Sequence, residues 1–524
     1  MNIDFNSALI ITGIDVLMAI SIYLPMSTGV LFLLPIGTMA TSAYTFAYLT
    51  IHGTPTVVAA LAGILLAGLV ALFGGALTAK LRGLVIAIAS LGMAEIIQVF
   101  VQNFAPLGAT QGLIGVPLVT TIPVTLAITV AVIALVVLVE FSPLGERIRA
   151  VEQDELAAGC VGVNVPRLTL TLQVTSGLIS GLAGVLSAGY LTYVGPTEFG
   201  IQQMNQFLMA AVLGGSTTTA GSVVGGVLTG FVPQLVQFLA TYQLLVYSAL
   251  VIVIVLVRRQ GLVTTVRLRR AITRRTWARK GKGVQIQQGL ALEIKGIRKR
   301  YGGIHVLNNV TLSAHAQEVL AIIGANGAGK TTLLNVISGV IRPDSGEVRL
   351  GDDAITGLAS HQIVKKGVVR TFQNLRLFGG MTVHENVAVV DAELGDSLLE
   401  MLRLREVADR DAKSLPYGYQ RRLEIARALA AKPKVLLLDE PTSGMTHGEA
   451  GEVAALIKDL RAQGLTIVLI DHNLRFVMQV ADRVVVLDRG AVIAEGDPYS
   501  VQQDPAVMDA YLIHTPKRTA VSET

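Results

Sequence analysis

The sequence GANGAGKT, from Gly324 to Thr331, decides the fold of the second half of this 524-residue chain. It fits the pattern G-x-x-x-x-G-K-[ST], and it lies between a strand-like run, residues 318–323, and a helical run that begins at Lys330. Glycines in such a loop let the backbone form a nest of N–H groups that faces phosphate at a helix N-terminus. A glycine-rich turn before an ordinary helix is the alternative, but the full match in this context predicts nucleotide binding.

Each residue of the loop and of the first helical turn has an expected role in binding ATP. Lys330 is expected to reach the β- and γ-phosphates, and Thr331 to hold Mg²⁺. The residues predicted to contact the nucleotide here are Gly324, Ala325, Asn326, Gly327, Ala328, Gly329, Lys330, Thr331 and Thr332.

The composition places the first half of the chain in a membrane. Hydrophobic residues make up 52% of the chain and charged residues only 15%, which is far from the average of soluble proteins. Charges are sparse before Arg258, whereas the sequence after Leu290 has the composition of a soluble α/β domain. We therefore predict an α-helical multi-span membrane domain of eight or nine spans, followed by an α/β P-loop ATPase domain.

A basic segment joins the two halves. Ten Lys or Arg and no Asp or Glu lie between Arg258 and Lys282. Since this segment directly follows the last apolar run, we interpret it as a juxtamembrane linker attracted by anionic lipid, and not as a nucleic-acid site. The single cysteine, Cys160, excludes an intramolecular disulfide and CxxC metal sites, and we expect it to be inert. The N-terminal residues lack the features of a signal peptide and are interpreted as the start of the first span.

The apolar runs define the predicted spans and their orientation. A short run at Gln203–Leu213 could be a half-span, and the runs long enough to cross hydrocarbon fall near residues 8–25, 29–50, 55–79, 83–104, 117–141, 168–191, 222–240 and 243–257. If helices alternate, the basic connections share one side, which the positive-inside rule makes cytoplasmic. The ATPase domain is then cytoplasmic and the N-terminus lies outside. The residues that set this orientation are Lys80, Arg82, Arg147, Arg149 and Arg167.

Polar residues inside apolar runs are candidates for function. Glu95 lies within a predicted span, where it could serve transport or act as a structural hydrogen-bond acceptor at a helix contact. Asp15 and Glu140 are placed nearer the ends of their spans and rank lower. The segment GGSTTTAGS, Gly214 to Ser222, could be a cavity-lining turn or a tight hairpin between two spans.

The first half resembles the M-type permease of branched-chain amino-acid ABC importers. The stretches that carry this resemblance are GLVIAIASLGMAEIIQ (Gly83–Gln98), TQGLIGVP (Thr110–Pro117), SPLGERIRAVEQDELAAGCVGVNVPR (Ser142–Arg167) and LLVYSALVIVIVLVRRQGL (Leu244–Leu262). In that family a cytoplasmic loop such as the third stretch carries a helix that docks on the ATPase. The resemblance therefore implies a coupling loop with charged residues Glu152, Asp154 and Glu155, where a solvated connection is the alternative.

The second half is similar to the G-type ATPase of the same importers. The matching stretches are RTFQNLRLF (Arg370–Phe378), YGYQRRLEIARAL (Tyr417–Leu429), VLLLDEPTSGM (Val435–Met445) and VADRVVVLDRGAVIAEGDP (Val480–Pro498). Asp439 ends an apolar strand of the kind buried in parallel sheets, so its carboxylate should emerge at the phosphate end and hold Mg²⁺ through water.

The resemblance implies further roles around the nucleotide. Glu440 would polarise the attacking water, and His472 would contact the γ-phosphate. Gln373 would sense both Mg²⁺ and the permease. Tyr301 would stack on adenine, although a lone tyrosine ahead of a strand is more often a packing residue.

The chain departs from the general family in three places. Where most such ATPases have LSGGQ, this chain has Leu415 followed by Pro416, Tyr417, Gly418 and Tyr419, so the serine that donates to the opposite γ-phosphate is missing. Thr446 stands where many relatives have an acidic residue. The interval between Gln373 and Leu415 is short, which predicts a reduced helical subdomain.

The sequence thus predicts an importer subunit with permease and ATPase in one polypeptide. The predicted parts are a permease domain at residues 1–257, the basic linker at 258–289, the nucleotide-binding domain at 290–513 and a tail at 514–524. The expected partners are the lipid bilayer of a prokaryotic inner membrane, a second permease and ATPase of the H and F types or a second copy, an external binding protein and a small-molecule substrate. An ABC exporter half-transporter and a nucleotide-binding regulator with little ATP turnover are the rivals.

Overall fold

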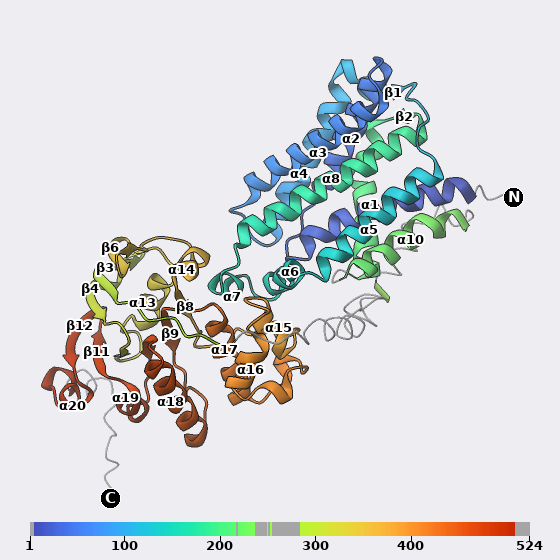
Figure 1. Cartoon of the computed structure of the whole chain (residues 1–524). Helices are drawn as coiled ribbons and strands as arrows, with labels where there is room; N and C mark the ends of the chain where they lie inside the picture. Colours follow the sequence, from blue (N-terminus) through green and yellow to red (C-terminus); the bar gives the residue numbers. More distant parts are fainter. Residues whose placement is uncertain (1–4, 216–217, 236–248, 250–251, 254–282, 509–524) are drawn as a thin grey trace, which may run out of the picture. The chain divides into compact units, whose positions relative to one another are not determined.

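The computed structural model describes residues 5–215, 218–235, 249, 252–253 and 283–508 (Figure 1). The chain forms two compact units. A helical unit contains residues 1–152 and 165–278, and a sheet unit contains residues 153–164 and 279–524. The predicted last span at 243–257, the basic linker up to residue 282 and the tail at 514–524 lie largely or wholly outside the described residues. The predicted boundaries at those places therefore stay predictions.

The helical unit is built from long apolar helices with short connections. Its elements are α1 (Phe5–Met26), α2 (Pro35–Ile51), α3 (Thr56–Thr78), α4 (Leu84–Asn103), α5 (Ile122–Glu140), α6 (Pro143–Gln153), α8 (Val165–Leu191), α9 (Ile201–Gly214) and α10 (Thr219–Leu235), the strands β1 (Leu113–Ile114) and β2 (Tyr193–Val194), and 3₁₀ turns at Ala105–Leu107, Ala109–Gln111 and Pro196–Phe199. Among the described residues, five helices are long and apolar enough to cross a membrane: α1, α3, α4, α5 and α8. The multi-span helical domain is confirmed, whereas the span count of eight or nine is not.

The helical unit is layered from a buried centre to an apolar exterior. Helix α1 is buried along most of its length and packs against α5, α8, α9 and α10. The outer helices α3, α4 and α5 instead expose large apolar side chains, such as Phe73, Ile96 and Leu138. An exposed apolar surface of this kind suits contact with lipid hydrocarbon, where helices satisfy their own backbone hydrogen bonds.

Small residues allow helix α8 to approach its neighbours. A Cβ atom built on Gly184 would lie 2.3 Å from the carbonyl oxygen of Met39 on α2, and one built on Gly177 would lie 2.3 Å from the Cβ of Ala71 on α3. Helices in lipid associate through close packing of this kind, because no hydrophobic effect drives them together there. The glycines of α8 thus set its distance from α2 and α3.

Asp15 lies in the middle of helix α1, and not near the end of a span as the sequence reading placed it. The residue is the eleventh of 22 in α1 and is buried. Its Oδ2 atom has no hydrogen-bond partner among the described residues. Glu140, in contrast, is the last residue of α5, as predicted, and its Oε2 atom accepts a hydrogen bond from the backbone N–H of Thr219 at the start of α10 (3.2 Å).

The glycine-rich segment Gly214–Ser222 connects two closely packed helices. Helices α9 and α10 lie against each other, and a Cβ atom on Gly225 would lie 1.8 Å from the carbonyl oxygen of Ala210. The short apolar run predicted at Gln203–Leu213 is helix α9, which has 14 residues. The described part of this segment therefore favours the tight hairpin over the cavity-lining turn.

The sheet unit has a parallel sheet, an antiparallel sheet and covering helices. Its elements are α7 (Glu155–Cys160), β3 (Leu292–Tyr301), β4 (Ile304–Ala314), β5 (Val319–Ile323), α13 (Lys330–Ile337), β6 (Ser345–Leu350), β7 (Asp353–Ala354), α14 (Ser360–Lys366), β8 (Val368–Arg370), α15 (Val383–Ala388), α16 (Gly395–Met401), α17 (Tyr417–Ala430), β9 (Val435–Asp439), α18 (His447–Ala462), β10 (Thr466–Ile470), α19 (Leu474–Val480), β11 (Arg483–Asp488), β12 (Ala491–Gly496) and α20 (Pro498–Gln502), with 3₁₀ turns at Arg405–Val407 and Ala412–Ser414.

The order of the strands in the larger sheet determines where the site lies. The order is β12-β11-β5-β10-β9-β8; β12 is antiparallel to β11, and the other neighbours are parallel. The smaller sheet, β4-β3-β6-β7, is antiparallel. Strands β5, β9 and β10 are buried throughout, as their uninterrupted apolar sequences predict. Their carboxyl ends meet at one edge, and ligands of such sheets bind at that edge.

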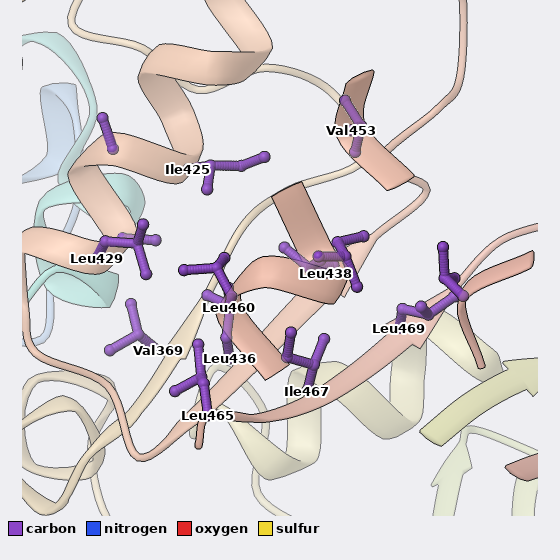
Figure 2. Close-up of a cluster of buried hydrophobic side chains, with 14 of the residues drawn as sticks. Val369, Ile425, Leu429, Leu436, Leu438, Val453, Leu460, Leu465, Ile467 and Leu469 are labelled. Carbon is purple, nitrogen blue, oxygen red and sulfur yellow. The ribbon is translucent and has the colours of Figure 1, made fainter. Parts of the chain in front are cut away.

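A continuous apolar core holds this edge in place. Figure 2 shows side chains of β9 and β10, including Leu436, Leu438 and Ile467, packed with Ile425 and Leu429 of α17. Fully burying one such side chain contributes about 1.5–3 kcal/mol. The core therefore ties α17 to the strands that carry the predicted acidic residues.

The close contact at Gly184 makes a testable prediction. Gly184→Val should prevent α8 from packing on α2 and should abolish recovery of monodisperse protein in detergent, measured by size-exclusion chromatography. Gly92→Val is the matched control, since Gly92 is exposed on α4 and a Cβ atom there meets nothing within 4 Å. Equal recovery of the two variants would contradict the packing argument.

Candidate functional site

The segment Gly324–Thr331 forms the phosphate-binding loop predicted from the sequence. It leaves the buried strand β5 and enters α13 at Lys330. Gly324, Gly327 and Gly329 have φ angles of 153°, 83° and 101°, which side-chain-bearing residues rarely adopt. Gly324 also has no room for a side chain, because a Cβ atom there would lie 2.1 Å from the carbonyl oxygen of Leu487 on β11. The loop can therefore present its N–H groups, and those of the first turn of α13, to phosphate.

Lys330 lies inside this loop and faces the acidic residues. Its Nζ atom donates to the carbonyl oxygens of Gly324 (2.7 Å) and Ala325 (2.9 Å). Burial lowers the pKa of Lys330, and the nearby carboxylates of Glu440 and Asp439 oppose that shift. The lysine is thus placed between the loop and the carboxylates, where a phosphate would meet its charge.

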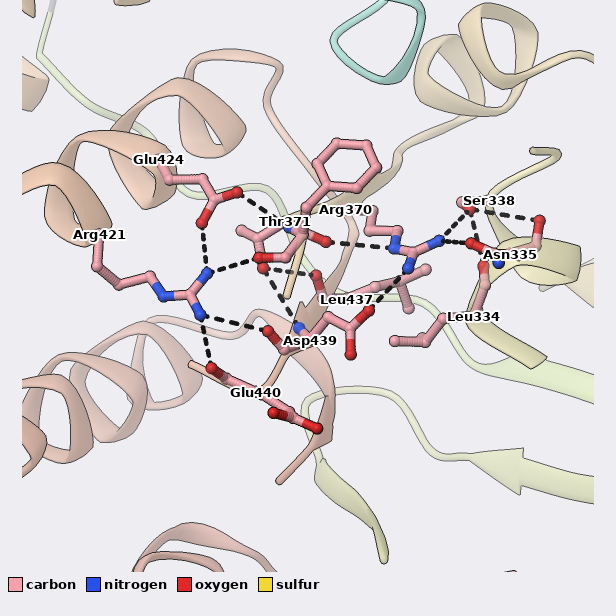
Figure 3. A network of polar contacts seen from close by, with 11 residues as sticks. Leu334, Asn335, Ser338, Arg370, Thr371, Arg421, Glu424, Leu437, Asp439 and Glu440 are labelled. Carbon is pink, nitrogen blue, oxygen red and sulfur yellow. Dashed lines mark hydrogen bonds and ion pairs between the residues drawn. The ribbon is translucent and has the colours of Figure 1, made fainter. Parts of the chain in front are cut away.

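Asp439 is held by a buried ion pair that the sequence reading did not predict. It is the last residue of β9, as predicted, and its Oδ2 atom accepts a hydrogen bond from Nη2 of Arg370 on β8 at 2.7 Å. The two side chains are 3% and 1% exposed. Figure 3 shows that Arg370 also reaches Asn335 and Ser338 of the segment that follows the loop.

The other oxygen of Asp439 suits the predicted metal. Its Oδ1 atom is buried and has no hydrogen-bond partner among the described residues. A buried carboxylate oxygen without a donor is costly unless something fills the position, and a water bound to Mg²⁺ would do so. Asp439 therefore fits the role of a Mg²⁺ residue through water. Thr331 is exposed in the first turn of α13.

Glu440 and His472 come together at the edge of the sheet. Nδ1 of His472 lies 3.5 Å from Oε2 of Glu440, and the histidine is 61% exposed while the glutamate is 15% exposed. Glu440 has a φ of 45°, which is strained for a residue that carries a side chain. Holding this conformation costs about 1–3 kcal/mol. Its N–H donates to the carbonyl oxygen of Ile470 at 2.7 Å. Strain of this kind persists only where surrounding contacts impose it.

A second buried arginine, Arg421 of α17, makes those contacts. Its guanidinium donates to the carbonyl oxygen of Glu440 (2.5 Å) and to that of Phe372 (2.8 Å), and it pairs with the carboxylate of Glu424 (2.5 Å). Arg421 and Glu424 are buried. Figure 3 shows both buried arginines on the two sides of Asp439.

Gln373 and Tyr301 come from different sheets, since Gln373 follows β8 of the larger sheet and Tyr301 ends β3 of the smaller one. Gln373 follows Phe372 and is exposed. Tyr301 ends β3 and is 46% exposed, with Nζ of Lys299 5.7 Å from the centre of its ring. An exposed ring fits a stacking surface better than the packing role that the sequence left open.

The segment LPYGY begins helix α17 in spite of its altered sequence. Pro416 is the N-cap residue and makes no side-chain cap, so the hydroxyl is missing as predicted. The N–H groups of Tyr417, Gly418 and Tyr419 still belong to the first turn, where an α-helix leaves its donors free for an anion. A Cβ atom on Gly418 would lie 2.6 Å from Oε1 of Glu449 on α18. The backbone is therefore suited to phosphate even without the serine.

Thr446 has a structural role that explains why a threonine can stand at a position where many relatives have an acidic residue. It caps α18: its Oγ1 atom accepts from the N–H of Glu449 and its own N–H donates to the Glu449 carboxylate. Thr and acidic residues are both good N-caps, so replacing one by the other keeps the helix start. The interval from Gln373 to Leu415 contains two short helices, α15 and α16, and two 3₁₀ turns. The reduced size of this subdomain relative to other family members stays a prediction.

The predicted coupling loop divides between the two units. Asp154 caps α7 through the N–H of Ala157 (2.9 Å) and pairs with Arg376 at 2.8 Å. Asp154 and Glu155 belong to the sheet unit, whereas Glu152 belongs to the helical unit. The division between the units thus falls directly after Glu152, within the group of acidic residues that the sequence predicted as one coupling loop.

Arg370, Arg421 and Glu424 are the residues that sequence reasoning missed. All three lie within stretches that carry the family resemblance, and a sequence signal was present for each of them. Arg370 ends an apolar strand, and Arg421 and Glu424 are spaced i,i+3 on an otherwise apolar helix face. A charged side chain at a buried position indicates that a group of opposite charge or a hydrogen-bond partner lies beside it.

Comparisons with known proteins agree with both halves of the chain. Residues 5–257 match the family model described as branched-chain amino acid transport system / permease component, and residues 307–443 match the ABC transporter model. Over 247 residues, 42% of this chain, it is 40% identical to the high-affinity branched-chain amino acid transport ATP-binding protein BraF of Pseudomonas aeruginosa and 39% identical to LivG of Escherichia coli (strain K12), covering 97% of each. A solved nucleotide-free ATP-binding cassette from an ABC transporter is 32% identical, with 42% of this chain and 98% of that chain covered and a TM-score of 0.40.

The two ion pairs of the segment Arg370–Arg376 make a matched prediction. Arg370→Met leaves Asp439 buried and unpaired, which should cost about 3–5 kcal/mol and lower the melting temperature of the full-length chain by on the order of 10 °C. Arg376→Met removes a half-exposed pair and should cost about 1 kcal/mol or less. An equal decrease in melting temperature for both variants would show that burial does not make the Arg370 pair more important for stability than the Arg376 pair.

Proposed function

We propose that this chain, which belongs to the ABC transporter family and joins a branched-chain amino acid type permease to an ABC ATPase, imports branched-chain or related hydrophobic amino acids. Its ATPase half couples ATP hydrolysis to transport. The observation that carries the proposal is the continuity of a permease component, residues 5–257, with the ATPase half in one polypeptide.

The direction of transport follows from the permease half. Exporter half-transporters share the order of membrane domain and ATPase, but residues 5–257 match a permease component of a branched-chain amino acid transport system. The relatives of the ATPase half are named for high-affinity transport of the same solutes. We therefore assign import to this chain and set the exporter aside.

ATP hydrolysis is assigned to the residues at the carboxyl ends of β5, β9 and β10. Lys330 binds the phosphates together with the loop, and Glu440 polarises the attacking water, with His472 beside it at the γ-phosphate. Thr331 and Asp439 would hold Mg²⁺, which neutralises charge on the phosphates when bound. The retention of Glu440 and its contact with His472 argue against a regulator that does not hydrolyse ATP.

The partners are proposed from what the chain carries and lacks. The loop needs a signature segment from a second ATPase, and Pro416 of this chain offers no hydroxyl in return. We propose a complex with a second permease and a second ATPase, or a second copy, and an external binding protein that delivers the amino acid. We propose a prokaryotic inner membrane as the location, and the basic segment after Arg258 supports an ATPase on its cytoplasmic side.

Uptake by the assembled complex tests this proposal. Proteoliposomes that contain the complex, internal Mg·ATP and external binding protein should accumulate radiolabelled leucine. Glu440→Gln should abolish both hydrolysis and uptake while ATP binding stays unchanged, since the variant keeps the shape of the side chain and loses the carboxylate. Leucine efflux, or unchanged turnover in Glu440→Gln, would contradict the proposal.

We expect the ion pair Asp154–Arg376 to link the predicted coupling loop to the ATPase, and thereby to couple ATP hydrolysis to uptake. Asp154→Arg and Arg376→Asp each replace the 2.8 Å ion pair by two like charges and should lower leucine uptake per ATP hydrolysed by several-fold. The double exchange restores opposite charges and should restore the ratio. Asp154→Asn, which keeps an oxygen for the cap of α7, is the comparison for loss of charge alone, and failure of the exchange to rescue coupling would remove this pair from the mechanism.

A further inference from the structure

We propose that Arg421 is a positioning residue that holds Glu440 in the conformation required for hydrolysis and ties that conformation to helix α17, which begins at the segment LPYGY. The inference rests on the proposed role of Glu440 in ATP hydrolysis and does not depend on which solute is transported. It rests on the backbone of Glu440, the hydrogen bonds of Arg421 and the burial of Arg421.

The backbone of Glu440 requires outside support. Its φ of 45° lies in the left-handed region, where a side chain is strained, and it directly follows the extended residue Asp439 that ends β9. This reversal determines where the carboxylate points. Without support, a residue with a Cβ atom would relax to negative φ, and the carboxylate would move away from His472.

Two hydrogen bonds fix the peptide groups on both sides of Glu440. Its N–H donates to the carbonyl oxygen of Ile470, the last residue of the adjacent strand β10, at 2.7 Å. Its carbonyl oxygen accepts from Nη2 of Arg421 at 2.5 Å, and the same Nη2 lies 3.4 Å from the carbonyl oxygen of Asp439. The sheet therefore supplies one constraint, and Arg421 supplies the other.

Arg421 itself is held by a network that reaches the segment before Gln373. Its Nη1 atom donates to the carbonyl oxygen of Phe372 (2.8 Å) and to Glu424 (2.5 Å), and the other carboxylate oxygen of Glu424 accepts from the N–H of Phe372 (3.0 Å). Both peptide groups of Phe372 are thus bound by the Arg421–Glu424 pair (Figure 3). Movement of Gln373 or of α17 would therefore change the position of Glu440.

Arginine is suited to this position and lysine is not. The planar guanidinium presents five donors in a fixed fork, whereas a lysine ammonium is a single point of charge. Here the fork serves carbonyl groups of two different segments and one carboxylate. A buried ion pair is not in itself more stabilising than packed apolar side chains, so its presence in this core indicates a role in fixing geometry.

The link has a consequence for how two nucleotide sites communicate. Helix α17 carries the segment LPYGY, which in an assembled pair of ATPases faces the nucleotide of the partner, whereas Glu440 serves the nucleotide bound to this chain. Arg421 lies in the second turn of α17, four residues after Tyr417. Through Arg421, occupancy of one site would adjust the catalytic carboxylate of the other.

The test compares three variants in the assembled complex, in which Mg·ATP turnover, ATP affinity and melting temperature are measured. The double variant Arg421→Met/Glu424→Met removes both charges, so no buried charge remains unpaired and the fold should persist. We expect kcat to fall about 100-fold, as misplacement of a catalytic group by an ångström does, with KM and the Kd of MANT-ATP within about twofold of wild type. Arg421→Lys should recover part of kcat, since it keeps the charge and one donor direction.

Arg422→Met is the matched control. Arg422 is the next residue of α17, and its guanidinium stacks 4.4 Å from the centre of the Tyr419 ring instead of reaching Glu440. Removing this charge should leave kcat within about threefold of wild type, because the peptide groups of Glu440 keep their donors.

Three results would overturn the proposal. The first is a double variant with kcat within threefold of wild type. The second is a fall in kcat that is matched by equal losses of ATP affinity and melting temperature, because that pattern shows a structural role alone. If the double variant does not fold, Arg421→Lys decides: wild-type kcat in that variant overturns the proposal, and a reduced kcat at unchanged KM supports it.

Discussion

Two buried arginines fix the carboxyl end of strand β9, and the rest of the site depends on that constraint. Arg370 holds one oxygen of Asp439, and Arg421 holds the carbonyl oxygen of Glu440. The two arginines come from different elements, β8 and α17, so the acidic residues are anchored from both sides. Because the anchors are buried, they act in a low dielectric where misplacement of a charge is costly.

This arrangement connects the loop Gly324–Thr331 with the segment that carries Gln373 and Arg376, which is proposed to link the ATPase to the permease. Arg370 also bonds Asn335 and Ser338, which follow the loop, and the strand of Arg370 continues into the segment that carries Gln373 and Arg376. In the proposed mechanism, phosphate binding and movement of the segment that carries Gln373 and Arg376 would therefore act on the same edge of the sheet. The altered segment LPYGY still begins helix α17 although it lacks the usual hydroxyl.

Local patterns in the sequence predicted much of this structure, whereas contacts between segments distant in the chain could not be predicted from them. The loop at Gly324–Thr331 and the buried strand ending at Asp439 were predicted correctly, because glycine spacing and apolar runs are local signals. The roles assigned to the individual site residues remain predictions.

The contacts that sequence reasoning missed depend on register and packing. The pair Arg370–Asp439 joins neighbouring strands separated by 69 positions in the chain, and the hydrogen bond of Arg421 to Glu440 spans 19. Asp15 was ranked as nearer the end of its span, but both the predicted run 8–25 and helix α1, which begins at Phe5, place it close to the middle. Helix ends are set by packing and are read least reliably from composition.

A high-resolution structure of the assembled complex with Mg²⁺ and a non-hydrolysable ATP analogue tests the central claim most directly. The account predicts that Glu440 keeps its positive φ with Arg421 on its carbonyl oxygen, and that Asp439 stays paired with Arg370 while its free Oδ1 atom receives a water bound to Mg²⁺. A structure in which Glu440 has a negative φ, or in which Asp439 leaves Arg370 to bind the metal, would contradict it.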